Sequence, residues 1–330
     1  MPKRSLLALL VIALMNLPAP AQAGDAVRVT VNARAALATV PDTGIGANHA
    51  IWDANLGTDE TAGLLKDAGV KLLRYPGGSY SDIYHWRDHT APGGYVAPGT
   101  DFDTYMRAVR RTGATPMVTA NYGTGDAQEA ADWVRSANVT KGYGVKYWEI
   151  GNENYGNGHY GAAWEADEHA DKSPAEYART VVAYADAMKA VDPSVKIGAV
   201  LTAPANWPDG LVGAGDDGTW NKVVLSTAGS KIDFVVLHWS PGALARGGPN
   251  PDMIRLTREQ LARYAGSDRI QIAMTEFNTG SSSNGTNTQP GALAAADSYA
   301  ALLAAGVFTV DWWNVHNGIG AVSQVAGHTD

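Results

Sequence analysis

The 330-residue chain contains no cysteine, so it has no disulfide, thiolate metal site, iron-sulfur cluster or cysteine nucleophile. It has no excess of positive charge either, because 25 Lys and Arg stand against 33 Asp and Glu. This balance disfavours nucleic acid and anionic membranes as partners. The sequence lacks a G-x-S-x-G segment for a serine nucleophile, and no G-x-G-x-x-G segment follows the first predicted strand. What remains, 45% hydrophobic and 18% charged residues, is the composition of a folded protein.

The first 23 residues have the three parts of a secretory signal peptide. Lys3 and Arg4 form a positive region, Leu6 to Leu17 an apolar region, and Ala21-Gln22-Ala23 a cleavage sequence. The apolar run is shorter than the roughly 20 residues of a membrane-spanning helix. The sequence therefore predicts a secreted protein, extracellular or periplasmic, whose mature chain begins at Gly24.

After about residue 43, short apolar runs alternate with longer amphipathic segments. The apolar runs predict eight strands: Gly44–Asn48, Val70–Arg74, Pro116–Ala120, Lys146–Ile150, Val195–Val200, Ile232–His238, Ile270–Thr275 and Phe308–Trp313. The segments between them predict helices at Glu60–Ala68, Phe102–Thr112, Gln128–Ala137, Pro174–Val191, Trp220–Thr227, Arg255–Ala265 and Gly291–Ala305. This alternation predicts an α/β fold, a (β/α)8 TIM barrel rather than an open doubly wound sheet.

We expect three parts: a signal peptide at 1–23, an N-terminal β segment at 24–42 and the barrel at 43–330. No recognisable final helix follows the eighth predicted strand, so we expect a barrel truncated after that strand. In such barrels the chemistry takes place at the C-terminal ends of the strands.

Two predicted strands are followed or ended by a carboxylate. Glu153 comes just after the fourth strand and Glu276 ends the seventh, so the two side chains can face each other across the barrel mouth. Carboxyl groups about 5 Å apart are what a retaining glycosidase needs, one as acid/base and one as nucleophile. The acid/base must hold a proton, and Trp148, Tyr155 and the charge of Glu276 are expected to raise its pKa. Alternatively, each Glu is an exposed rim residue.

Other polar and aromatic residues near the strand ends have two interpretations each. Arg74 either keeps Glu276 ionised or forms a structural ion pair, and Glu149 is interpreted as structural. His238 donates to Glu276 or to a sugar, or is a satisfied core histidine. Three tryptophans either stack on a sugar ring or only pack: Trp86, Trp239 and Trp312.

His85 and His89 have a spacing that binds zinc on a helix, but the surrounding Trp, Arg, Pro and Gly favour a loop. We therefore expect no metal and no cofactor.

These motifs resemble those of clan A glycoside hydrolases. Asn152-Glu153 and Glu276 look like their acid/base and nucleophile motifs. The segments Leu73–Gly78 and Tyr84–Asp88 are similar to the second-strand region of the α-L-arabinofuranosidases, as are Gly113–Gly125 and Glu129–Trp133. The resemblance runs from about Thr43 to Gln324. It implies Glu153 as acid/base, Glu276 as nucleophile and Asn152 as partner of the sugar 2-hydroxyl. It also implies a C-terminal β-sandwich, which we do not expect within these 330 residues.

The sequence departs from this group at three strand ends. The first strand ends in Gly46-Ala47-Asn48-His49 instead of a Glu, and Ser79 stands where Asn is common. The sixth strand ends in His238-Trp239-Ser240, whereas Tyr is common two residues after the His. We include Asn48 and Tyr155 among the expected substrate-binding residues. The bond-cleaving residues are thus kept, while the residues that recognise the sugar differ. The hypothesis is a secreted retaining α-L-arabinofuranosidase-like enzyme acting on plant carbohydrate. The alternatives are a β-glycanase or β-glycosidase of the same clan, or an inactive carbohydrate-binding protein.

Overall fold

The computed structural model describes residues 28, 30, 32, 34–36, 38–161, 163–204, 220–239, 251–279, 288–316, 324–325 and 328–329. The predicted signal peptide lies outside these residues, as does much of the predicted N-terminal β segment. Residues 38–330 belong to one compact unit.

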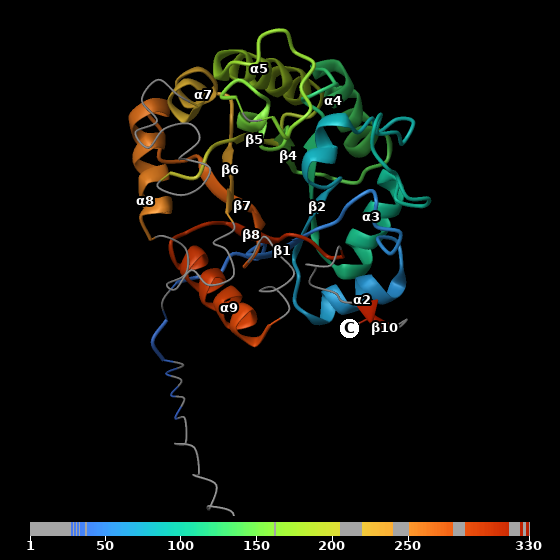
Figure 1. Cartoon of the computed structure of the whole chain (residues 1–330), viewed down its shortest axis with the longest axis vertical. Helices are drawn as coiled ribbons and strands as arrows, with labels where there is room; N and C mark the ends of the chain where they lie inside the picture. The colour runs from blue at the N-terminus through green and yellow to red at the C-terminus, as the bar shows by residue number, and fades with distance from the viewer. Residues whose placement is uncertain are drawn as a thin grey trace, which may run out of the picture. The chain divides into compact units, whose positions relative to one another are not determined.

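Eight parallel strands close into a barrel in chain order (Figure 1). They are β1 (Ile45–Asn48), β2 (Leu72–Tyr75), β3 (Thr115–Ala120), β4 (Tyr147–Ile150), β5 (Lys196–Val200), β6 (Phe234–Trp239), β7 (Gln271–Phe277) and β8 (Thr309–Trp312). The barrel closes where β1 pairs with β8, with Gly46 opposite Asp311. The predicted TIM barrel is confirmed, and each predicted strand lies within two residues of its observed bounds.

Helices form the outer layer around this barrel (Figure 1). They are α2 (Asp59–Asp67), α3 (Phe102–Thr112), α4 (Ala127–Val134), α5 (Pro174–Val191), α7 (Trp220–Ala228), α8 (Pro251–Gln260) and α9 (Gln289–Ala304). Wider π turns continue α4 as η2 (Arg135–Thr140) and α8 as η4 (Leu261–Ala265). The start of α5 follows its sequence signal, because the Ser173 side chain accepts a hydrogen bond from the backbone N–H of Glu176.

Short elements that the sequence did not predict complete the described chain. They are the 3-10 helices η1 (Gly78–Ile83) and η3 (Asn154–Gly156), and the antiparallel pair β9 (Gln324–Val325) and β10 (His328–Thr329). Both 3-10 helices lie in loops that follow strand ends, so they shape the edge of the barrel where chemistry is expected.

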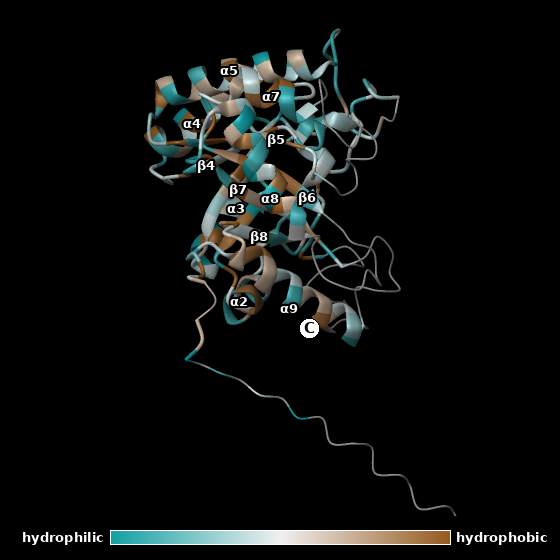
Figure 2. Ribbon diagram, turned by 90° about the vertical axis from the view of Figure 1, so that its left-hand side faces the viewer, coloured by the Kyte–Doolittle hydropathy of each residue, from teal (hydrophilic) through white to brown (hydrophobic). Residues whose placement is uncertain are grey.

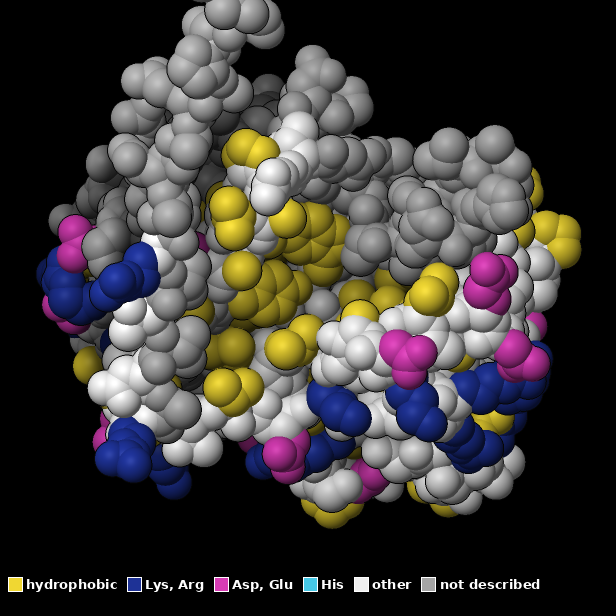
Figure 3. Space-filling model, turned by 90° about the horizontal axis from the view of Figure 1, so that it is seen from below, with side chains coloured by type: hydrophobic (Ala, Val, Ile, Leu, Met, Phe, Trp, Pro, Cys, Tyr) yellow, Lys and Arg dark blue, Asp and Glu magenta, His cyan; other side chains and the backbone are white. Residues whose placement is uncertain are grey.

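The hydrophobic core fills the space between strands and helices. Figure 2 shows the hydrophobic colour on the strands and on the inner sides of the helices. One face of the molecule shows hydrophobic side chains near its middle and both signs of charge toward its margin (Figure 3). Among the described helices, none combines the length and apolar character needed to cross a membrane.

Alternation along β4 sends Trp148 and Glu149 to opposite faces of the strand. Trp148 points to the helix layer, where its indole donates to the carbonyl of Val145 and meets Trp133 of α4 at 5.6 Å. Glu149 points into the barrel and forms an ion pair with Arg74. The expectation that Trp148 lies against Glu153 is therefore wrong.

Candidate active site

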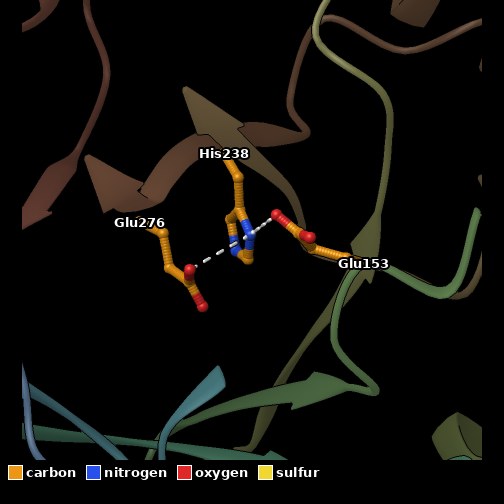
Figure 4. A group of neighbouring side chains, drawn as sticks. All are labelled: Glu153, His238 and Glu276. Carbon is orange, nitrogen blue, oxygen red and sulfur yellow. Dashed lines mark hydrogen bonds and ion pairs between the residues drawn. The ribbon is translucent and has the colours of Figure 1, made fainter. Parts of the chain in front are cut away.

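Three side chains from the C-terminal ends of β4, β6 and β7 meet at the barrel mouth: Glu153, His238 and Glu276 (Figure 4). One carboxylate oxygen from each Glu and a ring nitrogen of His238 all lie within 4.8 Å of one another. The two carboxylate side chains remain 18% and 15% exposed, so an incoming molecule can reach them. This is the separation at which one carboxyl can attack an anomeric carbon while the other transfers a proton.

Local irregularities of the backbone bring these side chains together. Between β6 and β7 the register shifts, so that Leu237 faces Met274 but His238 faces Glu276. The shift leaves Thr275 as an extra residue, and its hydroxyl lies 3.1 Å from His238 Nε2.

On the other side of the mouth, Glu153 adopts a left-handed conformation with φ 39° at the start of η3. Such strain in a non-glycine residue is concentrated at functional sites.

Arg74 is the buried centre of a network beneath the carboxylates. Its Nη1 donates to Glu276 Oε1 at 2.8 Å and to Asn48 Oδ1 at 2.9 Å. Its Nε donates to Glu149 Oε2 at 2.7 Å, and its Nη2 to Asn152 Oδ1 at 2.9 Å. Arg74 thus contacts Glu276 and also forms a structural ion pair with Glu149. The two alternatives that the sequence offered for Arg74 are therefore both present in the structure.

His238 sets the protonation of the two carboxyl groups. Its Nδ1 lies 2.9 Å from Glu153 Oε1 and 3.7 Å from Glu276 Oε2. Burial lowers the pKa of His238, but the charges of Glu276 and Glu153 outweigh burial and raise it. Burial raises the pKa of Glu153, but hydrogen bonds from His238 and Trp164 outweigh burial and lower it. Burial, together with the charge of Glu153, raises the pKa of Glu276 despite His238 and Arg74.

These directions favour a charged pair between protonated His238 and ionised Glu153. From the sequence we expect the opposite direction, a raised pKa for Glu153. The difference arises because Trp148 faces away, while an imidazole and the Trp164 indole donate hydrogen bonds to the carboxylate. Tyr155 is buried against Trp164 and Trp220, and its pKa is raised well above the usual value by burial and by the nearby Glu153 and Glu276.

The two predicted asparagines are buried and brace the site. Asn48 donates to the carbonyls of Thr275 and Trp312 at 2.8 and 3.2 Å while it accepts from Arg74. Asn152 accepts from Arg74 through Oδ1 and donates through Nδ2 to Glu165 Oε1 at 3.1 Å. These bonds fix both amides relative to the guanidinium.

The three predicted tryptophans lie in different surroundings. Trp239 ends β6 and stacks on Phe277 at 5.9 Å, and Trp312 of β8 meets the edge of the same ring. Phe277 in turn meets Tyr299 of α9 at 5.6 Å, so these contacts pack both tryptophans toward α9 rather than against the two carboxylates. Trp86 instead stacks on Trp133 of α4 at 5.8 Å and donates to the backbone carbonyl of Glu129. The structure thus places Trp86 in the helix layer and does not join it to the other two.

The histidines with zinc-like spacing bind separate partners. His85 lies 3.0 Å from a Glu129 oxygen, and His89 lies 2.9 Å from the hydroxyl of Tyr84. Within the described residues, the group whose ligand atoms come close enough for a metal is the Glu153, His238 and Glu276 cluster itself. There Arg74 already contacts Glu276 at 2.8 Å and His238 contacts Glu153 at 2.9 Å, so the carboxylates have partners within the protein.

Three residues of the site were missed by the sequence analysis. Trp164 donates from Nε1 to Glu153 Oε2 at 2.8 Å, and Glu165 accepts from Asn152. Asp82 of η1 accepts from the backbone N–H of Asn152 at 3.1 Å, which anchors the turn that carries Glu153. Their only sequence signal is their position in loops after strand ends, because no fixed spacing joins them to the carboxylates.

No protein family model matches the chain. Individual curated proteins are similar in sequence to the chain. α-L-Arabinofuranosidase C of Emericella nidulans is 30% identical over 160 residues, which cover 40% of this chain and 30% of that protein. The intracellular exo-α-(1→5)-L-arabinofuranosidase of Bifidobacterium longum is 28% identical over 218 residues, 58% of this chain and 36% of that protein. The matches span about a third of the length of these curated relatives.

Solved structures share the barrel. The family 51 α-L-arabinofuranosidase of Thermotoga petrophila aligns with a TM-score of 0.68 and 22% identity, over 88% of this chain and 69% of that one. A family 44 xyloglucanase of Paenibacillus polymyxa aligns with a TM-score of 0.60 and 14% identity, over 86% of this chain and 74% of the xyloglucanase chain. At these identities the solved structures establish only the fold. The similarity to α-L-arabinofuranosidases in sequence comes from the curated relatives. In sequence and fold the chain is therefore related to the α-L-arabinofuranosidases, a group of glycoside hydrolases.

Proposed function

We propose that the chain is a retaining glycoside hydrolase that removes α-L-arabinofuranosyl groups from plant polysaccharides or their oligosaccharides. The observation that carries this proposal is the approach of Glu153 and Glu276 to within 4.8 Å at one open barrel mouth. An inverting enzyme needs about 6.5 Å or more between its carboxyls to admit a water molecule. The sugar is proposed from the names of the curated relatives.

In the first step Glu276 attacks the anomeric carbon, and the bond from that carbon to the leaving oxygen breaks. Glu153 gives its proton to the leaving oxygen. The proton has a source in the site, because protonated His238 shares a 2.9 Å hydrogen bond with Glu153. Passing it along this bond leaves a neutral imidazole and a protonated Glu153.

In the second step water attacks the same carbon and displaces Glu276 as a carboxylate. Glu153, now ionised, takes the proton of that water. Arg74 Nη1 lies 2.8 Å from Glu276 Oε1 and stabilises the carboxylate as it leaves. Two inversions return the sugar with its original anomeric configuration.

A panel of 4-nitrophenyl glycosides tests the substrate class. We expect release from the α-L-arabinofuranoside and little from β-D-xylopyranoside or β-D-glucopyranoside, with the first-formed sugar in the α configuration by proton NMR. Release from the pyranosides alone would favour the β-glycosidase alternative. Binding of xylan or arabinan oligosaccharides without any release would favour a carbohydrate-binding protein, and a β product from the furanoside would contradict retention.

We also propose export from the cell, on the basis of the pattern in residues 1–23. Expression of the full chain in a bacterium followed by N-terminal sequencing is expected to give a mature protein that starts at Gly24 in the exported fraction. An unprocessed chain that stays in the cytosol would contradict this proposal.

A further inference from the structure

A third carboxyl group is buried beside the two proposed catalytic ones. Glu165 lies in the loop between η3 and α5 and is only 5% exposed. Its Oε1 accepts from Ser79 Oγ at 2.7 Å and from Asn152 Nδ2 at 3.1 Å. Its Oε2 is buried and finds no hydrogen-bond partner among the described residues. The mechanism given above does not use this side chain.

The groups that face Glu165 are acidic. Asp82 of η1, whose own pKa burial raises to about 8, and Glu153 are the acidic neighbours, and Tyr155 of η3 is the other titratable group near it. Burial, with the charges of Asp82 and Glu153, raises the pKa of Glu165 well above its ordinary value, although the bonds from Ser79 and Asn152 act against this. A buried carboxylate that is not paired with a cation is costly, so the neutral acid is favoured.

Two bonds, from Arg74 and to Glu165, together fix which way the Asn152 amide points. Asn152 Oδ1 accepts from Arg74 Nη2 at 2.9 Å while its Nδ2 donates to Glu165. If the amide turned over, its NH2 group would face the guanidinium, donor against donor. Arg74 in turn contacts Glu276 at 2.8 Å. A continuous chain of hydrogen bonds therefore runs from Glu165 through Asn152 and Arg74 to Glu276.

Glu165 is also held from the loop that follows β2. The hydroxyl of Ser79, in η1, donates to the same Glu165 oxygen. Backbone bonds hold the loop in place, since the N–H groups of Trp164 and Glu165 both reach the carbonyl of Gly156. Glu165 is thus held from both sides of the site.

We propose that Glu165 is a positioning residue that works as a neutral acid: it orients the Asn152 amide and thereby keeps Arg74 on Glu276. Its effect on turnover rests on the proposed function, whereas its protonation state does not. Glutamine has the same shape, accepts the same two hydrogen bonds and carries no charge.

Kinetics of the full chain on 4-nitrophenyl α-L-arabinofuranoside tests the positioning role. Glu165→Gln is expected to retain kcat/KM within about 2-fold and to leave both limbs of its pH profile in place. Glu165→Ala is expected to lower kcat/KM by roughly 10²-fold, the scale of a misplaced reacting group. Ser79→Ala keeps the Asn152 bond and is the matched control, with a loss of only a few-fold. Equal losses in the Gln and Ala variants, or a displaced limb in Glu165→Gln, would overturn the proposal.

Thermal unfolding against pH tests the neutral acid without any turnover. A carboxyl whose folded pKa is raised is most favourable to folding below its unfolded pKa of about 4.5, and this contribution is lost as pH rises toward the folded value. The melting temperature of the unchanged chain, measured relative to that of Glu165→Gln, should therefore fall progressively above about pH 4.5. A difference in melting temperature that does not vary with pH would overturn the proposal that Glu165 is a neutral acid. If no glycoside is cleaved but the pH-dependent difference appears, the proposed function fails and the protonation state of Glu165 stands.

Discussion

The Nδ1 atom of His238 lies 2.9 Å from Oε1 of Glu153 and 3.7 Å from Oε2 of Glu276, so one imidazole faces both carboxylates of the site. The charge of protonated His238 lowers the pKa of Glu153 and limits the rise that burial causes in the pKa of Glu276. Its charge is the reason why this site differs from the usual arrangement, in which the acid/base carries the raised pKa.

Replacing His238 by Phe should move the acidic limb of the pH profile of kcat/KM to higher pH. Without the imidazolium the pKa of both carboxyl groups rises, and Glu276 must be ionised to react. The basic limb, which in the unchanged chain follows loss of the proton that His238 passes to Glu153, then reports Glu153 itself. The control is Thr275→Val, which removes the bond to Nε2 but leaves the Glu153 contact. A His238→Phe profile that keeps its limbs would show that His238 does not set either pKa.

Glu276→Ala should reduce turnover by roughly 10⁴-fold or more, because the covalent step is lost. Azide fits the space of the missing carboxylate and should restore reaction with an activated aryl furanoside. The product is then a glycosyl azide of inverted configuration, which NMR identifies. Turnover that survives in this variant would remove Glu276 as nucleophile.

Glu153→Ala should affect substrates according to their leaving group. A poor leaving group needs the proton of Glu153, so its release should fall by roughly 10²- to 10⁴-fold. A dinitrophenyl leaving group needs no proton, so the first step should persist as a burst while hydrolysis of the intermediate slows. Azide should here give a product of retained configuration. The same loss for both leaving groups would contradict the acid/base role.

Arg74→Met should destabilise the fold as well as the site. Arg74 and Glu149 are both fully buried and 2.7 Å apart, so removing the cation leaves an uncompensated carboxylate in the barrel. Such a loss costs about 3–5 kcal/mol of unfolding free energy.

The double variant Arg74→Met with Glu149→Gln should regain part of this stability, since no charge then remains unpaired at that position. Urea unfolding of the two single variants and the double variant gives the coupling as a double-mutant cycle. If the changes in unfolding free energy of the two single variants add up to that of the double variant, Arg74 and Glu149 are not coupled in the folded protein.

Much of the barrel can be predicted from the sequence because its signals are local. Apolar runs and helical spacing identify the strands and helices, and the cap at Ser173 marks the start of α5. The carboxylates Glu153 and Glu276 are identified in the same way, because strand order alone brings the ends of β4 and β7 to one mouth of the barrel.

What the sequence by itself determined is the barrel, the pair of acidic residues at its mouth and the group of proteins that they resemble. The tertiary structure decided how those groups are charged and held. The face on which Trp148 lies, the register shift that turns His238 toward Glu276, and the loop that brings Glu165 to Asn152 depend on contacts between residues far apart in the chain. A pKa or an amide orientation reflects the sum of such neighbours in space, and periodicity along the sequence carries no record of that sum.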